Sequence, residues 1–147
     1  MQIRLPRTAD ADQLAALNRE LGYAVEPQEM RLRIERLSGL REHYIAVAEV
    51  EGDVVGWVHA EQRFSMESGA KAELVGLVVG AGRRRHGIGR SLVRAAEEWA
   101  ADRGLDAIVV RSNVVRPESH DFYKRIGYAP AKTQHVYVRP LRPGTEA

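Results

Sequence analysis

The residues best suited to chemistry lie between Val79 and Val93, where arginines and glycines follow an apolar run. Arg83 to Arg85 precede Gly87 and Gly89, and an amphipathic pattern typical of a helix begins at Ile88. Glycine lets a backbone approach a ligand closely, and the free N–H groups at a helix start point towards an anion. Guanidinium groups add charge and paired donors that suit phosphate. We therefore predict that a phosphate-bearing ligand binds at the start of this helix.

The glycine spacing excludes two common nucleotide-binding motifs. The P-loop string Gly-x-x-x-x-Gly-Lys-Ser/Thr does not occur in the chain. A dinucleotide-binding turn requires Gly-x-Gly-x-x-Gly, and Gly80-Ala81-Gly82 lacks the third glycine. A glycine pair before a helix is most often only a turn, and three arginines are most often a solvated surface. Their position at a strand-to-helix junction favours the phosphate site.

The elements that must position this segment alternate between strands and helices. Hydrophobic periodicity predicts helices at residues 10–21, 27–37, 88–103 and 118–126, and strands at 2–6, 44–50, 54–61, 72–79, 107–111 and 133–138. Glu51-Gly52-Asp53 predicts a hairpin turn, and Asp10 with Gln13 predicts a capping box. This order favours one α/β (α+β) domain that spans residues 1–147.

Composition narrows the function classes. The chain has 147 residues, no cysteine and a formal net charge of +2, which excludes disulfides and thiolate metal sites and argues against general nucleic-acid binding. The five histidines show no ligand spacing, so no metal is predicted. No apolar run reaches the length of a membrane span, and the first residues lack a signal-peptide core. We expect a cytoplasmic protein with no membrane partner.

Two motifs resemble a known family. Arg84-x-x-Gly87-x-Gly89 resembles the pyrophosphate signature Arg/Gln-x-x-Gly-x-Gly/Ala of the GNAT superfamily of acyl-CoA N-acyltransferases. The string from Phe122 to Tyr128 resembles the C-terminal Phe-Tyr-x-x-x-Gly-Phe/Tyr pattern of the same family. Ala81 departs from the family, which often has proline there. The resemblance implies the GNAT fold, a mixed central sheet of six to seven strands flanked by about four helices and splayed at the acetyl-CoA site.

The resemblance also implies an activity. It is direct transfer of an acetyl group from acetyl-CoA to a primary amine in a ternary complex, without a metal. The acceptor stays open between a small molecule, such as an aminoglycoside, a polyamine or an amino acid derivative, and a protein amine. The alternative is a non-catalytic, CoA-binding regulatory module. A homodimer is also left open.

The cofactor residues follow from the family's motifs. In the family, the strand before the glycine turn pairs with the pantetheine arm, and the turn holds the pyrophosphate through main-chain N–H groups. The residues at these positions are Leu77, Val78 and Val79 for the arm, and Arg84, Arg85, His86, Gly87, Ile88, Gly89 and Arg90 for the pyrophosphate. Asn113 corresponds to an asparagine that contacts pantetheine, although an asparagine after a strand is also typical of a turn.

Two residues are candidates for proton transfer. Glu73 interrupts an apolar strand six residues before Val79, where some GNAT enzymes carry a glutamate that acts as general base through water. Alternatively, Glu73 ends the strand and pairs with Lys71 or another surface cation, which leaves ordered water or His120 as the base. Tyr123, in the second motif, is the candidate general acid for the leaving thiolate. The acceptor cleft has no clear signature; residues 21–23, Trp57 and Tyr137 are equally suited to line it or to fill the core.

Overall fold

A five-stranded sheet forms the centre of the first of two compact units, residues 1–111 and 112–147. In the computed structural model, residues 1–84, 86–111 and 117–144 are described. The strands lie in chain order across the sheet and are β1 (Gln2–Arg4), β2 (His43–Val50), β3 (Asp53–Ser65), β4 (Gly69–Val79) and β5 (Ile108–Val110). The first four strands are antiparallel, and β5 runs parallel to β4.

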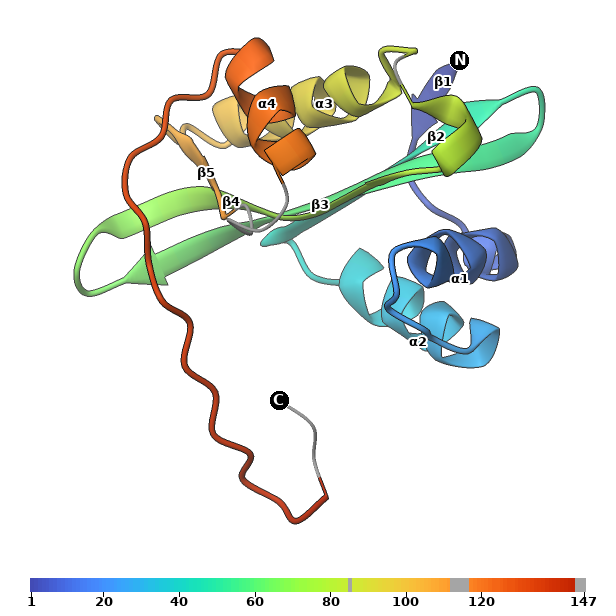
Figure 1. Cartoon of the computed structure of the whole chain (residues 1–147), viewed down its shortest axis with the longest axis horizontal. Helices are drawn as coiled ribbons and strands as arrows, with labels where there is room; N and C mark the ends of the chain where they lie inside the picture. The colour runs from blue at the N-terminus through green and yellow to red at the C-terminus, as the bar shows by residue number, and fades with distance from the viewer. Residues whose placement is uncertain (85, 112–116, 145–147) are drawn as a thin grey trace. The chain divides into compact units, whose positions relative to one another are not determined.

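Helices cover both faces of this sheet (Figure 1). Helices α1 (Ala11–Glu20) and α2 (Pro27–Ser38) lie on one face and α3 (Ile88–Asp102) on the other, while short 3-10 turns form at Thr8–Asp10 and Ala81–Arg83. The helix pair buries an apolar stripe against the sheet, which contributes Val47, Val54 and Val78. On the opposite face α3 buries Leu92 and Val93. In the described chain, no helix combines the length and apolarity that a bilayer crossing needs.

The turn between β2 and β3 forms as predicted. Glu51 and Gly52 have φ values of 51° and 86°, and two successive residues with positive φ are typical of the type I′ turn that suits the twist of a hairpin. The predicted capping box, in contrast, is wrong. Asp10 accepts hydrogen bonds from Arg4 and from the Arg7 N–H, whereas Gln13 Oε1 accepts from the Val54 N–H at 2.6 Å. Asp10 therefore caps the preceding 3-10 turn at Arg7, and Gln13 binds the sheet instead of the start of its own helix.

The second unit contains helix α4 (Pro117–Arg125) and an extended tail. The helix ends at Arg125, and Gly127 in the turn that follows has a φ of 102°. The predicted strand at residues 133–138 is wrong, because no strand is assigned there in the described chain and Val136 and Tyr137 are largely exposed. A strand needs a neighbour for its N–H and C=O groups, and among the described residues no strand pairs with this segment. The sheet therefore has five strands rather than six or seven.

Candidate cofactor and acceptor site

Strand β4 loses one of its two neighbours halfway along its length. Ala72 to Leu74 pair with β5, and no described residue pairs with that side of β4 beyond Leu74. On the opposite side, pairing with β3 continues to Val79. The backbone groups on the open edge of residues 75–79 therefore have no strand partner in the described chain. An extended ligand can take this place by the same hydrogen bonds that a strand would make.

A β-bulge lies where the pairing stops. The register changes between His59, opposite Gly76, and Ala60, opposite Leu74, so Val75 is the extra residue. A bulge bends its strand and ends regular pairing. A Cβ atom placed on Gly76 would lie 2.6 Å from two ring carbons of Trp57. The indole thus lies directly against the backbone of β4, and glycine is required at this position.

The first turn of α3 follows the open edge and is suited to an anion. Gly87 precedes the helix with a φ of 77°, and its carbonyl accepts a hydrogen bond from the Ser91 N–H at 3.1 Å. No side chain caps this end in the described residues. The N–H groups of Ile88, Gly89 and Arg90 have no acceptor within the helix, so they can bind an anion, which the helix dipole also favours.

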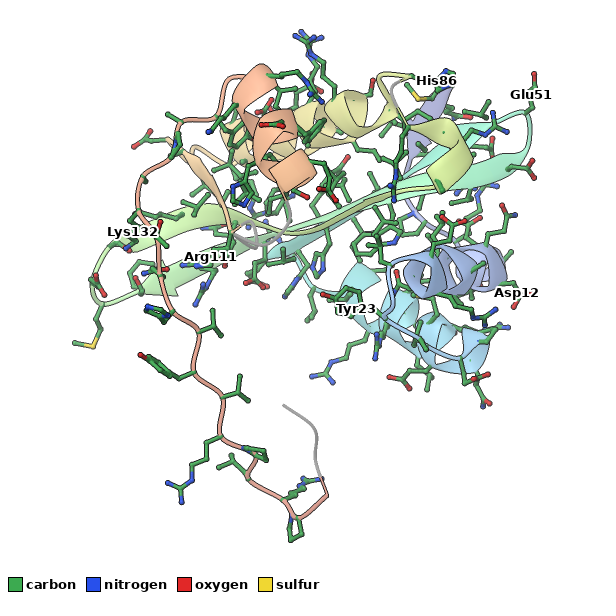
Figure 2. The ribbon with its side chains drawn as sticks, in the orientation of Figure 1. Asp12, Tyr23, Glu51, His86, Arg111 and Lys132 are labelled. Carbon is green, nitrogen blue, oxygen red and sulfur yellow. The ribbon has the colours of Figure 1, made fainter. Side chains whose placement is uncertain are left out.

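The predicted cofactor residues form a continuous segment from the strand edge to the helix start. Leu77, Val78 and Val79 lie on the open half of β4, and Gly87 to Arg90 cover the first turn of α3. Arg84 and His86 are exposed in the connecting turn, and Figure 2 labels His86. Two further predicted residues, Arg85 and Asn113, lie outside the described residues.

Glu73 lies in the half of β4 that is paired on both sides. It is opposite Glu61 of β3 and Val109 of β5, and only 8% of its surface is exposed. Arg63 Nη1 donates a hydrogen bond of 2.7 Å to its carboxylate, and Arg111, labelled in Figure 2, forms a second ion pair with it. Two guanidinium groups stabilise the ionised carboxylate. Glu73 is therefore an anchored anion within the strand, and its cation partners come from β3 and from the end of β5.

The second unit holds the candidate acid. Tyr123 lies on α4, and its ring makes edge contacts with Phe122 and Tyr128 at centroid distances of 5.1 and 5.7 Å. Burial raises the pKa of Tyr123 to about 12. The phenol therefore keeps its proton throughout the neutral range, as a general acid requires. His120, the alternative candidate for the base, lies one turn earlier on α4.

A cavity of about 140 Å³ lies between α1, α2 and the sheet. Most of its lining is apolar and consists of Leu14, Met30, Ile34, Leu37, Ile45 and Trp57. The polar lining residues are Asn18, Arg33 and His59. Asn18 Oδ1 accepts a hydrogen bond of 3.1 Å from Trp57 Nε1 and so fixes the indole that covers Gly76. Trp57, suggested by the sequence, lines this cavity, whereas Tyr23 and Tyr137 are exposed.

Two histidines beside the cavity form a polar chain that sequence reasoning missed. His59 Nε2 and His43 Nδ1 are 2.9 Å apart, and His43 Nδ1 lies 3.8 Å from Glu61 Oε2. Burial, together with the neighbouring His43, lowers the pKa of His59 to about 4. His59 is therefore neutral at physiological pH. The sequence did contain a signal for this polar chain: the hairpin around the predicted turn at residues 51–53 has a register in which His43 lies opposite Glu61. No cluster able to hold a metal occurs within the part of the chain that the structure describes.

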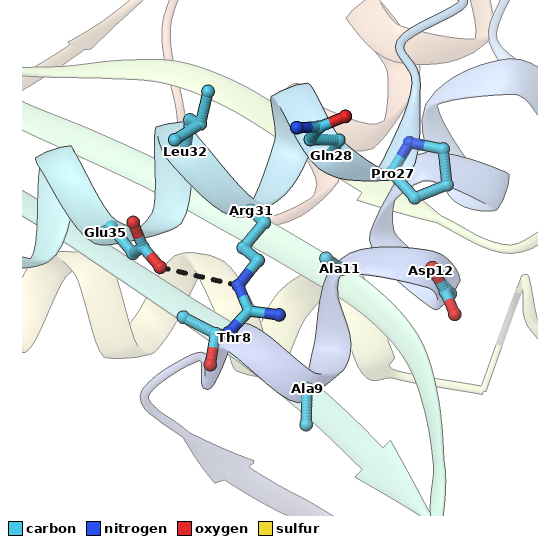
Figure 3. A pocket seen from close by; sticks show the side chains of 9 residues that line it. All are labelled: Thr8, Ala9, Ala11, Asp12, Pro27, Gln28, Arg31, Leu32 and Glu35. Atoms are coloured by element: carbon cyan, nitrogen blue, oxygen red, sulfur yellow. Dashed lines mark hydrogen bonds and ion pairs between the residues drawn. The ribbon is translucent and has the colours of Figure 1, made fainter.

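A larger cavity of about 610 Å³ lies elsewhere on the helix pair (Figure 3). Residues from the start of α1 and from α2 line it, and Arg31 and Glu35 form an exposed ion pair of 3.4 Å on α2. Exposed pairs of this kind contribute little. None of the predicted site residues lines this cavity, so its size alone does not make it the candidate site.

Comparisons with known proteins agree with this geometry. The profile of the Acetyltransferase (GNAT) family matches residues 11–128. Acetyl transferase GW6a of Oryza sativa subsp. japonica is 31% identical over 121 residues. That match covers 74% of this chain but 29% of the rice protein, so the chain spans less than a third of its relative.

Two solved acetyltransferases have the same fold. Aminoglycoside N-acetyltransferase AAC(6')-Iy, in complex with the bisubstrate analogue CoA-S-monomethyl-acetylneamine, has a TM-score of 0.83 at 16% identity, covering 95% of this chain and 97% of that chain. Ribosomal-protein-alanine N-acetyltransferase from Brucella melitensis biovar Abortus 2308 has a TM-score of 0.75 at 22% identity, covering 95% and 100%. At these identities the likeness shows the fold alone, and the two proteins have different acceptors in their names.

Proposed function

Because the chain belongs to the Acetyltransferase (GNAT) family, we propose that it transfers an acetyl group from acetyl-CoA to a primary amine in a ternary complex. The chain carries the acetyl-CoA-dependent N-acetyltransferase domain of that family. One observation carries the proposal: the strand edge that opens after Leu74 leads directly into the uncapped start of α3. An extended arm with a pyrophosphate at one end matches both features.

The residues divide the work of binding between backbone and side chains. Leu77 to Val79 offer the open edge for the pantetheine arm, and the N–H groups of Ile88 to Arg90 receive the pyrophosphate. Arg84 and Arg90 are exposed on either side of this turn and add charge. A backbone N–H on the open edge would donate to the thioester oxygen and stabilise the charge that develops there. We extend the proposed binding set to Arg85, His86 and Asn113, as the family motif does.

Two proton transfers complete the proposed reaction. Glu73 would accept, through water, the proton that the nitrogen loses as the amide forms, and Tyr123 would donate a proton to the thiolate that leaves. Tyr123 holds the proton that this step needs, because burial raises the pKa of its phenol to about 12. The two arginines that hold Glu73 make its carboxylate a weaker base, so its assignment as base rests on its position in the family pattern. The acetyltransferase domain is proposed to include residues 1–147 as one catalytic unit, alone or as a homodimer.

Replacement of one glycine tests the cofactor site. Gly89→Glu places a side chain and a negative charge against the proposed pyrophosphate. The helix dipole stabilises an acidic side chain in the first turn, so this variant should stay folded. We expect its affinity for CoA, measured by calorimetry, to fall about 100-fold or more, because the new carboxylate repels the negatively charged pyrophosphate. Gly39→Glu is the matched control, because that glycine is exposed at the end of α2.

The outcomes separate enzyme from regulator. Unchanged CoA affinity in folded Gly89→Glu would overturn the cofactor site. Tight CoA binding by the unmodified protein, with no thiol release across a panel of amines, would instead support a CoA-binding regulatory module. Arg84→Ala should weaken CoA binding less than Gly89→Glu does, because the main-chain donors remain.

A further inference from the structure

The cavity below Trp57 has an unusual charge balance for a site that receives amines. Among the residues described, its lining includes no carboxylate: the polar members are Asn18, Arg33 and His59. An ammonium group that enters this lining without a counterion loses hydration and gains no ion pair in return. A polycationic acceptor would therefore be rejected by this cavity.

The cavity adjoins the strand that is proposed to bind the pantetheine arm. Its wall is Trp57, which lies opposite Val78 in the β3–β4 register. The same indole lies against Gly76, the residue before the proposed arm-binding segment. A molecule in the cavity therefore reaches the open half of β4 across a single side chain.

Size and lining define what fits. An apolar cavity of about 150 Å³ holds one benzene ring, and this cavity measures about 140 Å³ with six apolar side chains in its wall. One aromatic ring or branched alkyl group occupies such a space, whereas an aminoglycoside or a polyamine brings several charges and no apolar group of that size.

The charged groups around the cavity do not supply a counterion. From α2, Arg33 adds a positive charge, and Glu29 on the same helix pairs with it at 3.3 Å, both side chains being about half exposed. From the sheet, His59 is neutral because burial lowers its pKa to about 4. His43 and Glu61 lie behind His59, and Glu61 also faces Arg63, which pairs with Glu73.

We propose that the acceptor is a primary amine carrying one ring-sized apolar group, and that it enters this cavity as the uncharged free base. This inference rests on the proposed acetyl transfer and names its substrate class. The ammonium form gives up its proton to solvent before binding. In the complex the amine nitrogen bonds to the acetyl carbon, the carbon–sulfur bond breaks with its electron pair on sulfur, and the nitrogen loses one proton while sulfur gains one.

The pH dependence gives the sharpest test. Since kcat/KM reports the free enzyme and free substrate, its acidic limb should follow the pKa of the acceptor itself. We would compare phenethylamine with β,β-difluorophenethylamine, which has the same ring but a much less basic nitrogen. The limb should move to lower pH by the difference between the two amine pKa values. A limb at the same pH for both amines would overturn the inference, because it would belong to a group on the protein.

Acceptor choice and three variants, one of them a control, provide an independent test. The kcat/KM for phenethylamine should exceed that for spermidine or kanamycin by about 100-fold or more, because the charges of a polycation find no counterion in the cavity. A preference for either polycation would overturn the inference. Leu37→Trp should fill the cavity and lower kcat/KM for phenethylamine about tenfold or more. Leu32→Trp, at an exposed position of the same helix outside this cavity, should not. Asn18→Asp should reduce the ratio of kcat/KM between phenethylamine and spermidine, because it adds a carboxylate to the cavity and keeps an acceptor for Trp57 Nε1.

A binding measurement separates this inference from the proposed function. Phenethyl alcohol, a neutral isostere of the free base, should bind the CoA-loaded protein in calorimetry, and Leu37→Trp should abolish this binding. If no amine releases thiol but the alcohol binds in this way, the proposed transfer fails and the cavity assignment stands. If thiol is released but the alcohol does not bind, the cavity assignment fails and the transfer stands.

Discussion

The two halves of strand β4 differ in their strand partners and in their charged side chains. Ala72 to Leu74 have strand neighbours on both sides, and the charged core residue among them, Glu73, is held by two arginines. Residues after Leu74 have a single strand neighbour in the described chain and carry no ionisable side chain. The first half satisfies its own polar groups, whereas the second leaves backbone groups for a ligand.

The change occurs within two residues. Val75 is the bulged residue and Gly76 is the residue that Trp57 covers. A bulge releases the strand from regular pairing, and a glycine lets the indole approach closely. The doubly paired segment therefore ends at the point where Trp57, a wall of the proposed acceptor cavity, lies against β4. A site of this kind depends on anchoring one half of a strand while the other is left open.

The largest expected effect concerns Tyr123, the candidate acid on α4, because the open half of β4 has no ionisable side chain of its own. Tyr123→Phe should lower kcat about 100- to 10,000-fold, the usual contribution of a general acid, while the ring keeps its packing. Turnover should recover with a thioester whose thiol is more acidic, since such a thiol leaves without help. Tyr128→Phe is the matched control in the same aromatic cluster. Equal losses on both thioesters would make Tyr123 a packing residue.

A side chain at the boundary should damage stability and the cavity together. Gly76→Val would place its Cβ 2.6 Å from the Trp57 ring, and overpacking of this kind costs about 1 to 3 kcal/mol of unfolding free energy. Displacement of the indole should also lower kcat/KM for the acceptor about tenfold or more. Urea denaturation and turnover measure the two effects. Gly39→Val is the control, because the nearest atom to its Cβ is 3.7 Å away. Unchanged kcat/KM for the acceptor in Gly76→Val would show that the packing of Trp57 on Gly76 does not affect the cavity.

The closed half is tested by removing one charge. If Glu73 is a base as well as an anchor, Glu73→Gln should lower kcat about tenfold or more, remove the acidic limb of kcat and leave CoA affinity unchanged. Since kcat reports the complex, this limb is distinct from that of kcat/KM. Glu67→Gln, at the exposed hairpin tip, is the control. A lower unfolding midpoint with an unchanged kcat profile would restrict Glu73 to the anchoring role.

The smallest expected effect is a change in pH dependence at His59, which lies opposite Gly76. Its pKa falls from 6.5 to about 4 on folding, so between these values the unfolded state binds more protons. The free energy of unfolding should therefore rise with pH across this window, and the contribution is lost as pH falls towards 4. His59→Gln should flatten the slope in urea titrations. The exposed His135→Gln should leave it unchanged, and a parallel slope in His59→Gln would contradict the assignment.

Several features followed from local sequence because local physics decides them. Gly52 and Gly87 adopt positive φ where the turns were predicted, and Pro27 begins α2 as its fixed φ favours. The glycine turn, the amphipathic helix after it and the family motif were enough to predict the fold and the cofactor. Hydrophobic periodicity also gave every strand from β1 to β5, although the bounds of β3 and β4 are longer than predicted.

Other features depended on contacts between segments distant in the chain. The carboxamide of Gln13 binds the backbone of Val54 rather than its own helix start. Residues 133–138 have the alternation of a strand but lack a partner in the described structure, and alternation alone cannot supply one. The acceptor cavity belongs to the same group: it joins Asn18 of α1, Leu37 of α2 and Trp57 of β3, which no single sequence window contains.

By itself, the sequence determined most element types, the glycine turn and the family, because propensity, turn chemistry and motif spacing act over a few residues. Only the tertiary structure decided that Glu73 is held by Arg63 and Arg111, that β4 opens after Leu74, and that the cavity has no carboxylate in its described lining. These properties arise from strand register and helix packing, which bring side chains together across tens of residues of chain. Charge and burial at a site are properties of such neighbours, so they exist only once the chain has folded.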